Sequence, residues 1–466
     1  MQNSAAEKSA NRHLYVLILI LIIDLLSFTC ILPLFPSILD GYAKSVPRDE
    51  LFSIFERTVR KLEAFIGVPN LIRYNNVFLG GVLGSLFSFL QYLSSPFLGA
   101  LSDVYGRKPI LLASIIGSLI SYYIWSISTT FSIFVLSRIV GGLSKASVSI
   151  STAIVSDLCS TAQRGRGMAF VGVAFSVAFI LGPMIGAYFS ATSKIGSSNS
   201  LMNPPYFAMT LTVIEIILVI LFLPETLKHN VKEKKKNSNI VLSAYNYISP
   251  KSIFNFSPVQ KLLKQTSLNQ IRAYGIVYFI YLFLYSALEF TLSFHTHILF
   301  HYDGMQQGKM YFFVGILMII IQGGYVRRIS NDKHHRFAFI GLLTIVPAYI
   351  LISIAETQLV FYLGLCLYSI ASAIVVPCLT TLVSQLSPES EKGVTMGVFR
   401  SIGALSRALG PIFGSLTFWL LGPKYCYGLG AVLFAIPLLM LRKVQYTSHH
   451  STITSTSTTA AAAKEQ

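Results

Sequence analysis

The chain has 466 residues, of which 53% are hydrophobic and only 12% are charged. Soluble domains carry about 25% charged residues, so this composition excludes an ordinary soluble protein and places most of the chain in a lipid bilayer. The net charge of +17 is also typical of nucleic-acid binders. The basic residues, however, lie in short segments between apolar runs, where they orient a membrane protein. We therefore expect no nucleic acid among its partners.

Apolar runs long enough to cross a bilayer recur along the chain in two sets of six. A crossing helix needs about 20 apolar residues, and continuous runs of this length exclude a β-barrel. We predict an all-α membrane protein with twelve transmembrane helices in two pseudo-symmetric six-helix bundles, 14–223 and 273–441. The expected spans are Leu14–Leu34, Val77–Phe97, Ile110–Ile127, Phe131–Asp157, Met168–Phe189, Tyr206–Leu223, Tyr274–Phe294, Met310–Val326, Phe337–Ala355, Leu359–Leu382, Val394–Leu420 and Tyr425–Leu441.

The segments between the spans carry most of their Lys and Arg residues on one side of the predicted membrane. This bias predicts that the N-terminal tail 1–13, the central loop 224–272 and the C-terminal tail 442–466 are cytoplasmic, in a plasma or organelle membrane. The C-terminal tail is of low complexity, which predicts disorder. In the outer loop 37–76, apolar and charged residues alternate near helical spacing. We predict an amphipathic helix packed on the outer surface, and favour it over a lid that closes on a ligand.

Asp24 lies inside the first span, within LYVLILILIIDLLSFTCILPL. An ionised carboxylate at this depth is costly unless it faces water or a partner, and such residues usually bind or move something. No G-x-S-x-G, Walker loop or H-E-x-x-H accompanies it. The five cysteines are scattered without a CxxC pair, which argues against disulfides and zinc. We therefore expect a transporter, not an enzyme, without a cofactor and without an ATP-binding loop.

The loop after the second span reads GALSDVYGRKP and contains Gly99, Asp103, Gly106, Arg107 and Lys108. Its glycines permit a tight turn, and Asp103 and Arg107 are one helical turn apart. The pattern resembles the signature G-x-x-x-D-x-x-G-R-[KR] of the major facilitator superfamily. In that family the motif holds the two halves closed on the cytoplasmic side, and an acid at the end of the fourth helix, here Asp157, commonly joins it. The resemblance implies a gate.

The fourth span carries a polar stripe at helical spacing, formed by Arg138, Gly141, Lys145, Ser149 and Thr152. These positions share one helix face, and two cations on that face cannot point at lipid. Arg138 with the following Gly141-Gly142 resembles the R-x-x-G-G pattern of the same family. For Arg138 we favour structural pairing with an acid, and for Lys145 a role in the cavity.

Glycine–proline pairs mark the fifth and eleventh spans. Gly182-Pro183 with Gly186 resembles an antiporter pattern that bends the helix and lets it pack closely. Gly410-Pro411 repeats this in the eleventh span. Near the outer end of the seventh span stand three histidines, His295, His297 and His301. No carboxylate or cysteine lies at ligand spacing from them, so we expect no metal site.

The charges inside the predicted spans indicate the type of substrate. The acids are Asp24, Glu215 and Glu289, and the bases are Arg138, Lys145, Arg400 and Arg407. If one acid holds a proton, the cavity is net positive and favours anions. A carboxyl in a low-dielectric cavity holds its proton more readily, so Asp24 and Glu289 are the expected proton carriers. We interpret Glu215 as a structural partner.

The resemblance to the major facilitator superfamily covers the chain apart from its tails, through stretches such as SRIVGGLSKASVSISTAIVSDL and GVFRSIGALSRALGP. It is strongest to the tetracycline/proton antiporter branch, and it implies a monomeric, proton-coupled transporter of small organic anions that works by alternating access. The substrate would contact Lys145, Arg138, Ser149, Glu289, Arg400 and Arg407. Two alternatives stay open: a proton-coupled exporter of cationic or zwitterionic drugs, and a non-transporting receptor or chaperone on the same scaffold.

Overall fold

The computed structural model describes residues 2–31, 34–45, 47–66, 72–159, 164–192, 203–227, 245, 247–260, 263–330, 332–387 and 392–444. These residues form helices and no strands, as the long apolar runs predict. The first half contains α1 (Gln2–Thr29), α2 (Phe35–Lys44), α3 (Glu50–Ile66), α4 (Ile72–Tyr105), α5 (Arg107–Ser126), α6 (Phe131–Ser144), α7 (Ser147–Leu158), α8 (Arg164–Thr192) and α9 (Asn203–Phe222). The second half contains α12 (Pro250–Asn255), α13 (Gln265–Phe300), α14 (Gly304–Gly324), α15 (His334–Ser353), α16 (Gln358–Leu386), α17 (Lys392–Leu433) and α18 (Ala435–Lys443).

The helices account for every predicted span. Within the described residues, 10 stretches are long and apolar enough to cross a bilayer, and Phe170–Gly186 of α8 is a shorter apolar helix. One of the 10, Val394–Lys443, is 50 residues long and is interrupted at Gly422, whose φ of 77° is not helical. Because glycine adopts this conformation without a steric penalty, the chain can reverse there between the last two crossings.

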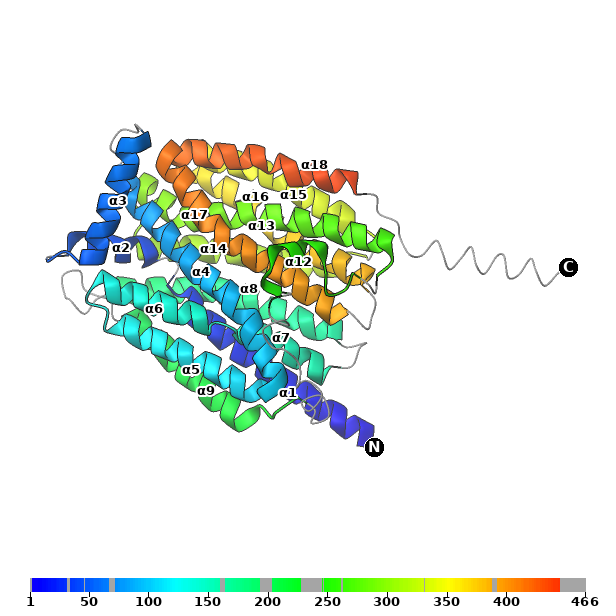
Figure 1. Cartoon of the computed structure of the whole chain (residues 1–466). Coiled ribbons are helices and arrows are strands. Elements are labelled where there is room, and N and C mark those ends of the chain that lie inside the picture. Colours follow the sequence, from blue (N-terminus) through cyan, green and yellow to red (C-terminus); the bar gives the residue numbers. More distant parts are fainter. Residues whose placement is uncertain are drawn as a thin grey trace.

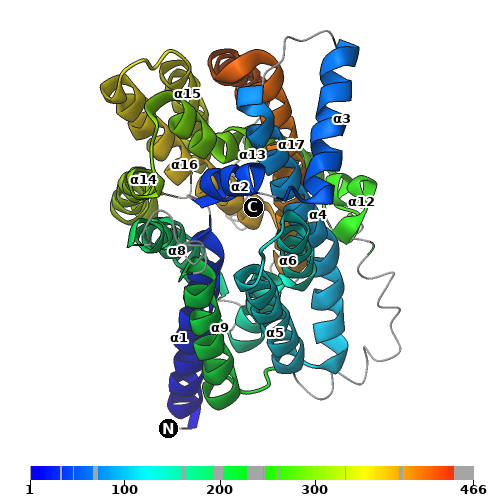
Figure 2. The same ribbon diagram turned by 90° about the vertical axis from the view of Figure 1, so that its left-hand side faces the viewer.

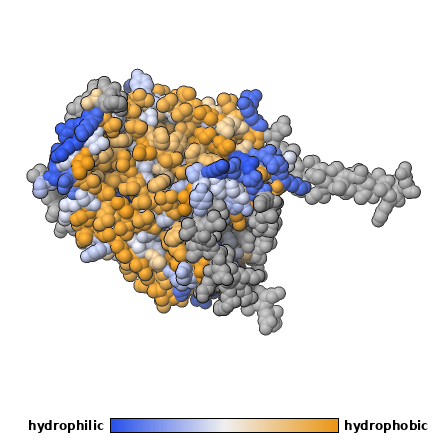
Figure 3. All heavy atoms as spheres, viewed as in Figure 1, coloured by the Kyte–Doolittle hydropathy of each residue, from blue (hydrophilic) through white to orange (hydrophobic). Residues whose placement is uncertain are grey.

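The two halves lie side by side in the bundle. Figures 1 and 2 show α1, α5 and α9 in the lower part of the molecule and α15, α16 and α18 in the upper part. The start of α1 and the end of α18 lie at the same end of the bundle, opposite α2 and α3. Figure 3 shows an apolar surface over the middle of one face, with hydrophilic residues gathered towards the two ends. This distribution is the one expected of a protein whose middle faces lipid.

The halves contact each other at the end where α2 and α3 lie. There α4 packs along α17, and α8 packs along α14. Trp419 Nε1 donates to Asn75 Oδ1 at 2.8 Å, and Ile412 N donates to Ser85 Oγ at 2.8 Å. These bonds join residues more than 300 positions apart in the sequence. In the predicted orientation this end is the outer one, so the structure is closed on the outer side.

Four elements refine the sequence prediction. The outer loop contains the predicted amphipathic helix as α3, whose Phe52 packs edge-on against Phe131 at 5.2 Å. It also contains α2, a second helix that the sequence analysis did not predict. In the second half, α13 begins at Gln265, ahead of the apolar run at Tyr274, and α12 packs on it within the predicted central loop. The apolar run marks only the part of each helix that crosses lipid, so the polar ends are missed.

Candidate functional site

The fourth span is two helices, not one, and the break falls at Lys145. The helix α6 ends at Ser144, Lys145 has φ −78° and ψ 80°, and α7 begins at Ser147. Backbone groups on both sides of the break bond to one side chain of α5. Ser114 Oγ donates to Ser144 O at 2.5 Å and accepts from Ala146 N at 3.1 Å. Irregular backbone inside a membrane protein is tolerated where such partners exist.

This break overturns the predicted continuous polar stripe. A single helix would align Arg138, Lys145 and Ser149 on one face, but the non-helical residues shift the register between α6 and α7. Ser149 lies instead against α4, where its Oγ is 3.4 Å from the position a Cβ would take at Gly99. The three residues therefore occupy different environments, and Ser149 does not contact the ion pair described next.

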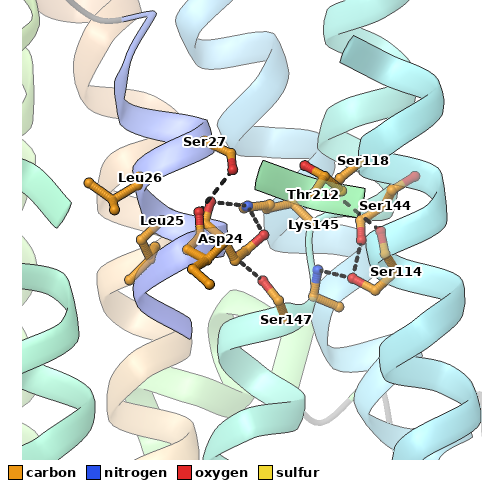
Figure 4. Close-up of polar contacts among 12 residues, drawn as sticks. Asp24, Leu25, Leu26, Ser27, Ser114, Ser118, Ser144, Lys145, Ser147 and Thr212 are labelled. Atoms are coloured by element: carbon orange, nitrogen blue, oxygen red, sulfur yellow. Dashed lines mark hydrogen bonds and ion pairs between the residues drawn. The ribbon is translucent and has the colours of Figure 1, made fainter. Parts of the chain in front are cut away.

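Lys145 forms a buried ion pair with Asp24 of α1 (Figure 4). Lys145 Nζ is 2.5 Å from Asp24 Oδ1, and both residues are at most 4% exposed. Ser147 Oγ at the start of α7 donates to Asp24 Oδ2 at 2.5 Å. The ammonium also lies 5.3 Å from the centre of the Phe28 ring. The carboxylate thus has a partner on each oxygen, which is the condition for keeping a charge pair out of water.

Glu215 of α9 lies beside this pair but is not bonded to it. The side chain is 0% exposed, and neither carboxyl oxygen has a hydrogen-bond partner in the described structure. Asp24 and Lys145 are its electrostatic neighbours. The interpretation of Glu215 as a structural partner is therefore wrong, because it holds no group in place through a hydrogen bond or an ion pair.

Arg138 is buried among aromatic rings, which take the place of the acid that was expected to pair with it. Its guanidinium lies 5.2 Å from the ring centre of Trp125 and 5.3 Å from that of Phe134. Nε donates to Ser137 Oγ at 3.3 Å, while Nη2 has no hydrogen-bond partner within the described residues. Ring faces stabilise a desolvated cation by roughly 2 kcal/mol. Pairing of Arg138 with an acid was thus predicted wrongly, since the aromatic rings take that place.

In the second half, Glu289 of α13 is held by hydroxyl groups. Tyr285 OH donates to Glu289 Oε1 at 3.3 Å and lies 3.0 Å from Ser372 Oγ of α16. The Tyr285 ring stacks on Tyr368 with 5.2 Å between centres. Arg407 of α17 is close enough to act on Glu289 electrostatically. This cluster is a polar surface of tyrosines with one acid, unlike the ion pair of the first half.

The two arginines of α17 differ in exposure. Arg407 is exposed and Arg400 is half-buried, and both act electrostatically on Tyr278 of α13. Their helix packs closely on α13 through the predicted small residues, because a Cβ at Gly410 would lie 2.1 Å from Ser286 Oγ. In the first half, a Cβ at Gly186 would lie 1.9 Å from the carbonyl oxygen of Cys30, just after α1. Neither Pro183 nor Pro411 ends its helix.

The predicted gate residues form a network at the inner end of the first half. Arg107 pairs with Asp103 at 2.6 Å and with Asp157 at 2.9 Å. Its backbone N–H donates to Glu225 Oε1 at 2.9 Å, and that of Lys108 donates to Glu225 Oε2 at 3.1 Å. All of these partners belong to the first half. In this conformation the network ties α4, α5, α7 and the segment after α9 together.

Glu225 belongs to this network but was missed by the sequence prediction. Gly106 (φ 117°) supplies the turn, and a Cβ there would lie 2.5 Å from Glu225 Oε2. A carboxylate at a helix N-terminus is favoured by the unpaired N–H groups and the helix dipole. The signal in the sequence is an acid just after the sixth span, on the side of the membrane where the signature motif lies.

The three histidines lie in two environments, because His297 and His301 line one small cavity and His295 is not part of its lining. His295 is buried among the rings of Phe361, Phe418 and Tyr427. His297 Nε2 is 3.1 Å from Asp40 Oδ2 of α2, so the pair joins the two halves at the outer end. Asn76 Nδ2 donates to the other oxygen of Asp40 at 2.5 Å. Burial opposes ionisation of Asp40, but the bonds from His297 and Asn76 outweigh it and hold its pKa below the usual range.

Comparisons with known proteins agree with this arrangement. The profile of the Major Facilitator Superfamily matches residues 17–411. Major facilitator superfamily domain-containing protein 10 of Mus musculus is 41% identical over 95% of both chains. The tetracycline resistance protein, class H, of Pasteurella multocida is 30% identical over 47% of this chain and 46% of its own. The crystal structure of the human organic anion transporter MFSD10 (TETRAN) superposes with a TM-score of 0.77 at 41% identity, over 93% of this chain and 99% of that one.

Proposed function

The chain belongs to the major facilitator superfamily of transporters, and we propose that it moves small organic anions by alternating access coupled to protons. The observation that carries this proposal is the buried pair of Lys145 and Asp24. Lys145 stands where the helix is broken, at the level where transporters of this kind place their substrates. It is the cation that a bound anion would contact.

The charges around the pair favour an anion. Arg138 is caged by aromatic rings without a carboxylate contact, and in the second half Arg407 is exposed near a half-buried Glu289. Adding a cation to these groups increases repulsion, whereas an anion reduces it. The human relative of known structure is named an organic anion transporter, which supports the same choice for this chain.

Competition for Lys145 gives a physical basis for proton coupling. An anion that binds the ammonium displaces Asp24, which then becomes a buried carboxylate without a cation. Such a charge is strongly disfavoured, so Asp24 takes up a proton. Anion binding at Lys145 and proton binding at Asp24 are therefore linked. Glu289, held by Tyr285 in the second half, is the second candidate proton carrier.

Rocking of the halves would expose this site alternately. The structure is closed at the outer end through α4–α17 contacts and the Asp40–His297 pair. We propose that the Arg107 network forms the inner gate and that both termini are cytoplasmic, because α1 begins and α18 ends at that end. The bilayer and the proton complete the set of partners, and a single chain suffices for the cycle.

One observation favours the cationic-drug alternative. Glu289 lies among tyrosine rings, and aromatic faces with an acid are a common site for organic cations. The tetracycline resistance protein matched above is named for resistance to a drug that is not a simple anion. The two functions differ in which half makes the decisive contact, so substitution at Lys145 separates them.

The test is uptake into proteoliposomes at several pH values, with a panel of radiolabelled aromatic carboxylates, sulfonates and quaternary amines. We expect Lys145→Ala to abolish anion uptake, and Lys145→Arg to keep part of it because the charge survives while the geometry changes. Asp24→Asn should remove the pH dependence but leave anion exchange. Lys309→Ala, which removes an exposed lysine of α14, is the matched control and should behave as the parent. Normal anion uptake by Lys145→Ala, or transport of amines only, refutes the proposal.

A further inference from the structure

Glu215 is a buried acid that no contact in the described structure explains. It sits on α9, which packs against α1, α5 and α8. Its exposure is 0%, and both carboxyl oxygens lack hydrogen-bond partners. Native proteins leave few buried polar groups unpaired, and those that remain usually have a functional reason.

The groups that face Glu215 are a carboxylate, an ammonium and a phenol. They are Asp24 of α1, Lys145 between α6 and α7, and Tyr122 of α5. Figure 4 shows Thr212, one turn before Glu215 on α9, beside Lys145 and Ser118. Thr212 itself donates to Ala208 O in its own helix at 2.8 Å. The face of α9 that carries residues 212 and 215 is therefore turned towards the ion pair.

The single ammonium cannot neutralise both acids. Lys145 Nζ is 2.5 Å from Asp24 Oδ1, and Ser147 holds the second oxygen of Asp24. Glu215 has no cation of its own and makes no hydrogen bond. An ionised carboxylate in these surroundings would be strongly destabilising, whereas the neutral acid is tolerated. With Glu215 protonated, the charges of Asp24, Lys145 and Glu215 sum to zero.

We propose that Glu215 carries a proton in this outward-closed conformation and passes it to Asp24 when an anion takes Lys145. This inference rests on the proposed function and assigns the proton store to a residue that the sequence analysis took for a structural partner. The O–H bond of Glu215 breaks, a new O–H bond forms on Asp24, and the electron pair stays on Glu215. The ionised Glu215 is then reprotonated from the aqueous side, so one proton enters for each anion bound.

The protonation state can be tested without any substrate. Infrared spectra of the full-length protein in detergent at neutral pH, wild type minus Glu215→Gln, should show loss of a carboxylic acid C=O band. The matched control, Glu56→Gln on α3, removes an acid that pairs with Arg48 and should show loss of carboxylate bands only. A difference spectrum for Glu215→Gln that contains only carboxylate bands overturns the proposal.

The relay is tested by comparing two kinds of flux with the anion that wild type transports best. Glu215→Gln should lower proton-driven accumulation by roughly tenfold or more, as expected when a proton-transfer group is removed. Anion exchange, which needs no net proton movement, should stay within about twofold of wild type. Glu215→Asp, which keeps a carboxyl, should recover part of the accumulation, and this excludes a folding defect as the cause.

The outcomes separate this inference from the function it rests on. Equal accumulation by Glu215→Gln and wild type refutes the relay, while the anion function still stands on Lys145. Equal loss of exchange and accumulation in Glu215→Gln and Glu215→Asp also refutes it, because the residue is then structural. Normal anion uptake by Lys145→Ala refutes the proposed function itself, whatever Glu215 does.

Discussion

The two halves of the molecule stabilise an intramembrane carboxyl group in different ways. In the first half Asp24 faces the ammonium of Lys145 and a serine hydroxyl, both at 2.5 Å. In the second half Glu289 accepts a longer bond of 3.3 Å from Tyr285, within a cluster of tyrosines. One acid is neutralised by a full opposite charge, and the other is solvated by dipoles.

This difference implies different tasks. An ion pair can be broken by a competing anion, and each partner is left with a large penalty until something replaces it. Hydroxyl groups reorient and accept either protonation state, so a carboxyl among them changes charge at a smaller cost. The first half is therefore suited to link substrate and proton, and the second half to provide an adaptable wall.

Among the substitutions that test this comparison, Lys145→Met is expected to lower stability most. The substitution leaves Asp24 buried without a cation, and breaking a buried pair typically costs about 3–5 kcal/mol. The thermal unfolding midpoint of the purified protein in detergent should fall accordingly. We expect Asp24→Leu with Lys145→Met to recover most of the loss, because no unpaired charge remains.

The double variant decides how the pair acts. If the double variant loses as much stability as the two single substitutions added together, the two charges contribute independently and the ion pair has no special role. If the double variant is stable but transports no anion at any pH, the pair is needed for function while its contribution to stability is replaceable.

Glu289→Gln is expected to have a much smaller effect on stability. Glutamine keeps an oxygen that accepts from Tyr285, so the loss should be about 1 kcal/mol or less. The same unfolding measurement checks it, with Tyr285→Phe as the companion that removes the donor. A loss as large as that of Lys145→Met would mean that Glu289 is ionised and paired, and the contrast between the halves would fail.

The positions of the crossing helices could be predicted from sequence because each one must satisfy the same local rule. Lipid on the outside demands an apolar run of fixed length, and all twelve expected spans correspond to helices or to parts of one. The break in the fourth span could not be predicted in this way. It depends on packing against α5, where Ser114, 30 positions before Ser144, bonds to the backbone on both sides of the break.

The site shows the same limit. Asp24 and Lys145 were each singled out as costly intramembrane charges, but their pairing joins residues 121 positions apart and is a property of the packed helices. Arg138 was expected to need an acid, and the structure gives it Trp125 and Phe134 instead. A charge in a membrane span predicts that some partner exists, but the sequence does not specify which kind of group provides it.

The smallest effect is expected where the halves meet, at the half-exposed pair of Asp40 and His297. Exposed pairs contribute about 0.2–1 kcal/mol, so Asp40→Asn should shift the closed-to-open ratio at the outer end by at most roughly fivefold. The readout is labelling of Val77→Cys, which lines the small outer cavity between the halves, by an impermeant thiol reagent. Faster labelling in Asp40→Asn is the expected result.

The pH dependence of this closure has a definite sign. The pKa of Asp40 lies below its usual range, so its contribution to closure is present above the ordinary pKa of a free aspartate. That contribution is lost as the pH falls through the lowered value, so labelling should rise there in the parent but not in Asp40→Asn. Asp49→Asn is the control, since Asp49 bonds Ser132 within the same half and should leave labelling unchanged. If both aspartate variants label alike, the contact between the halves does not hold the outer end closed, and packing of α4 on α17 is sufficient.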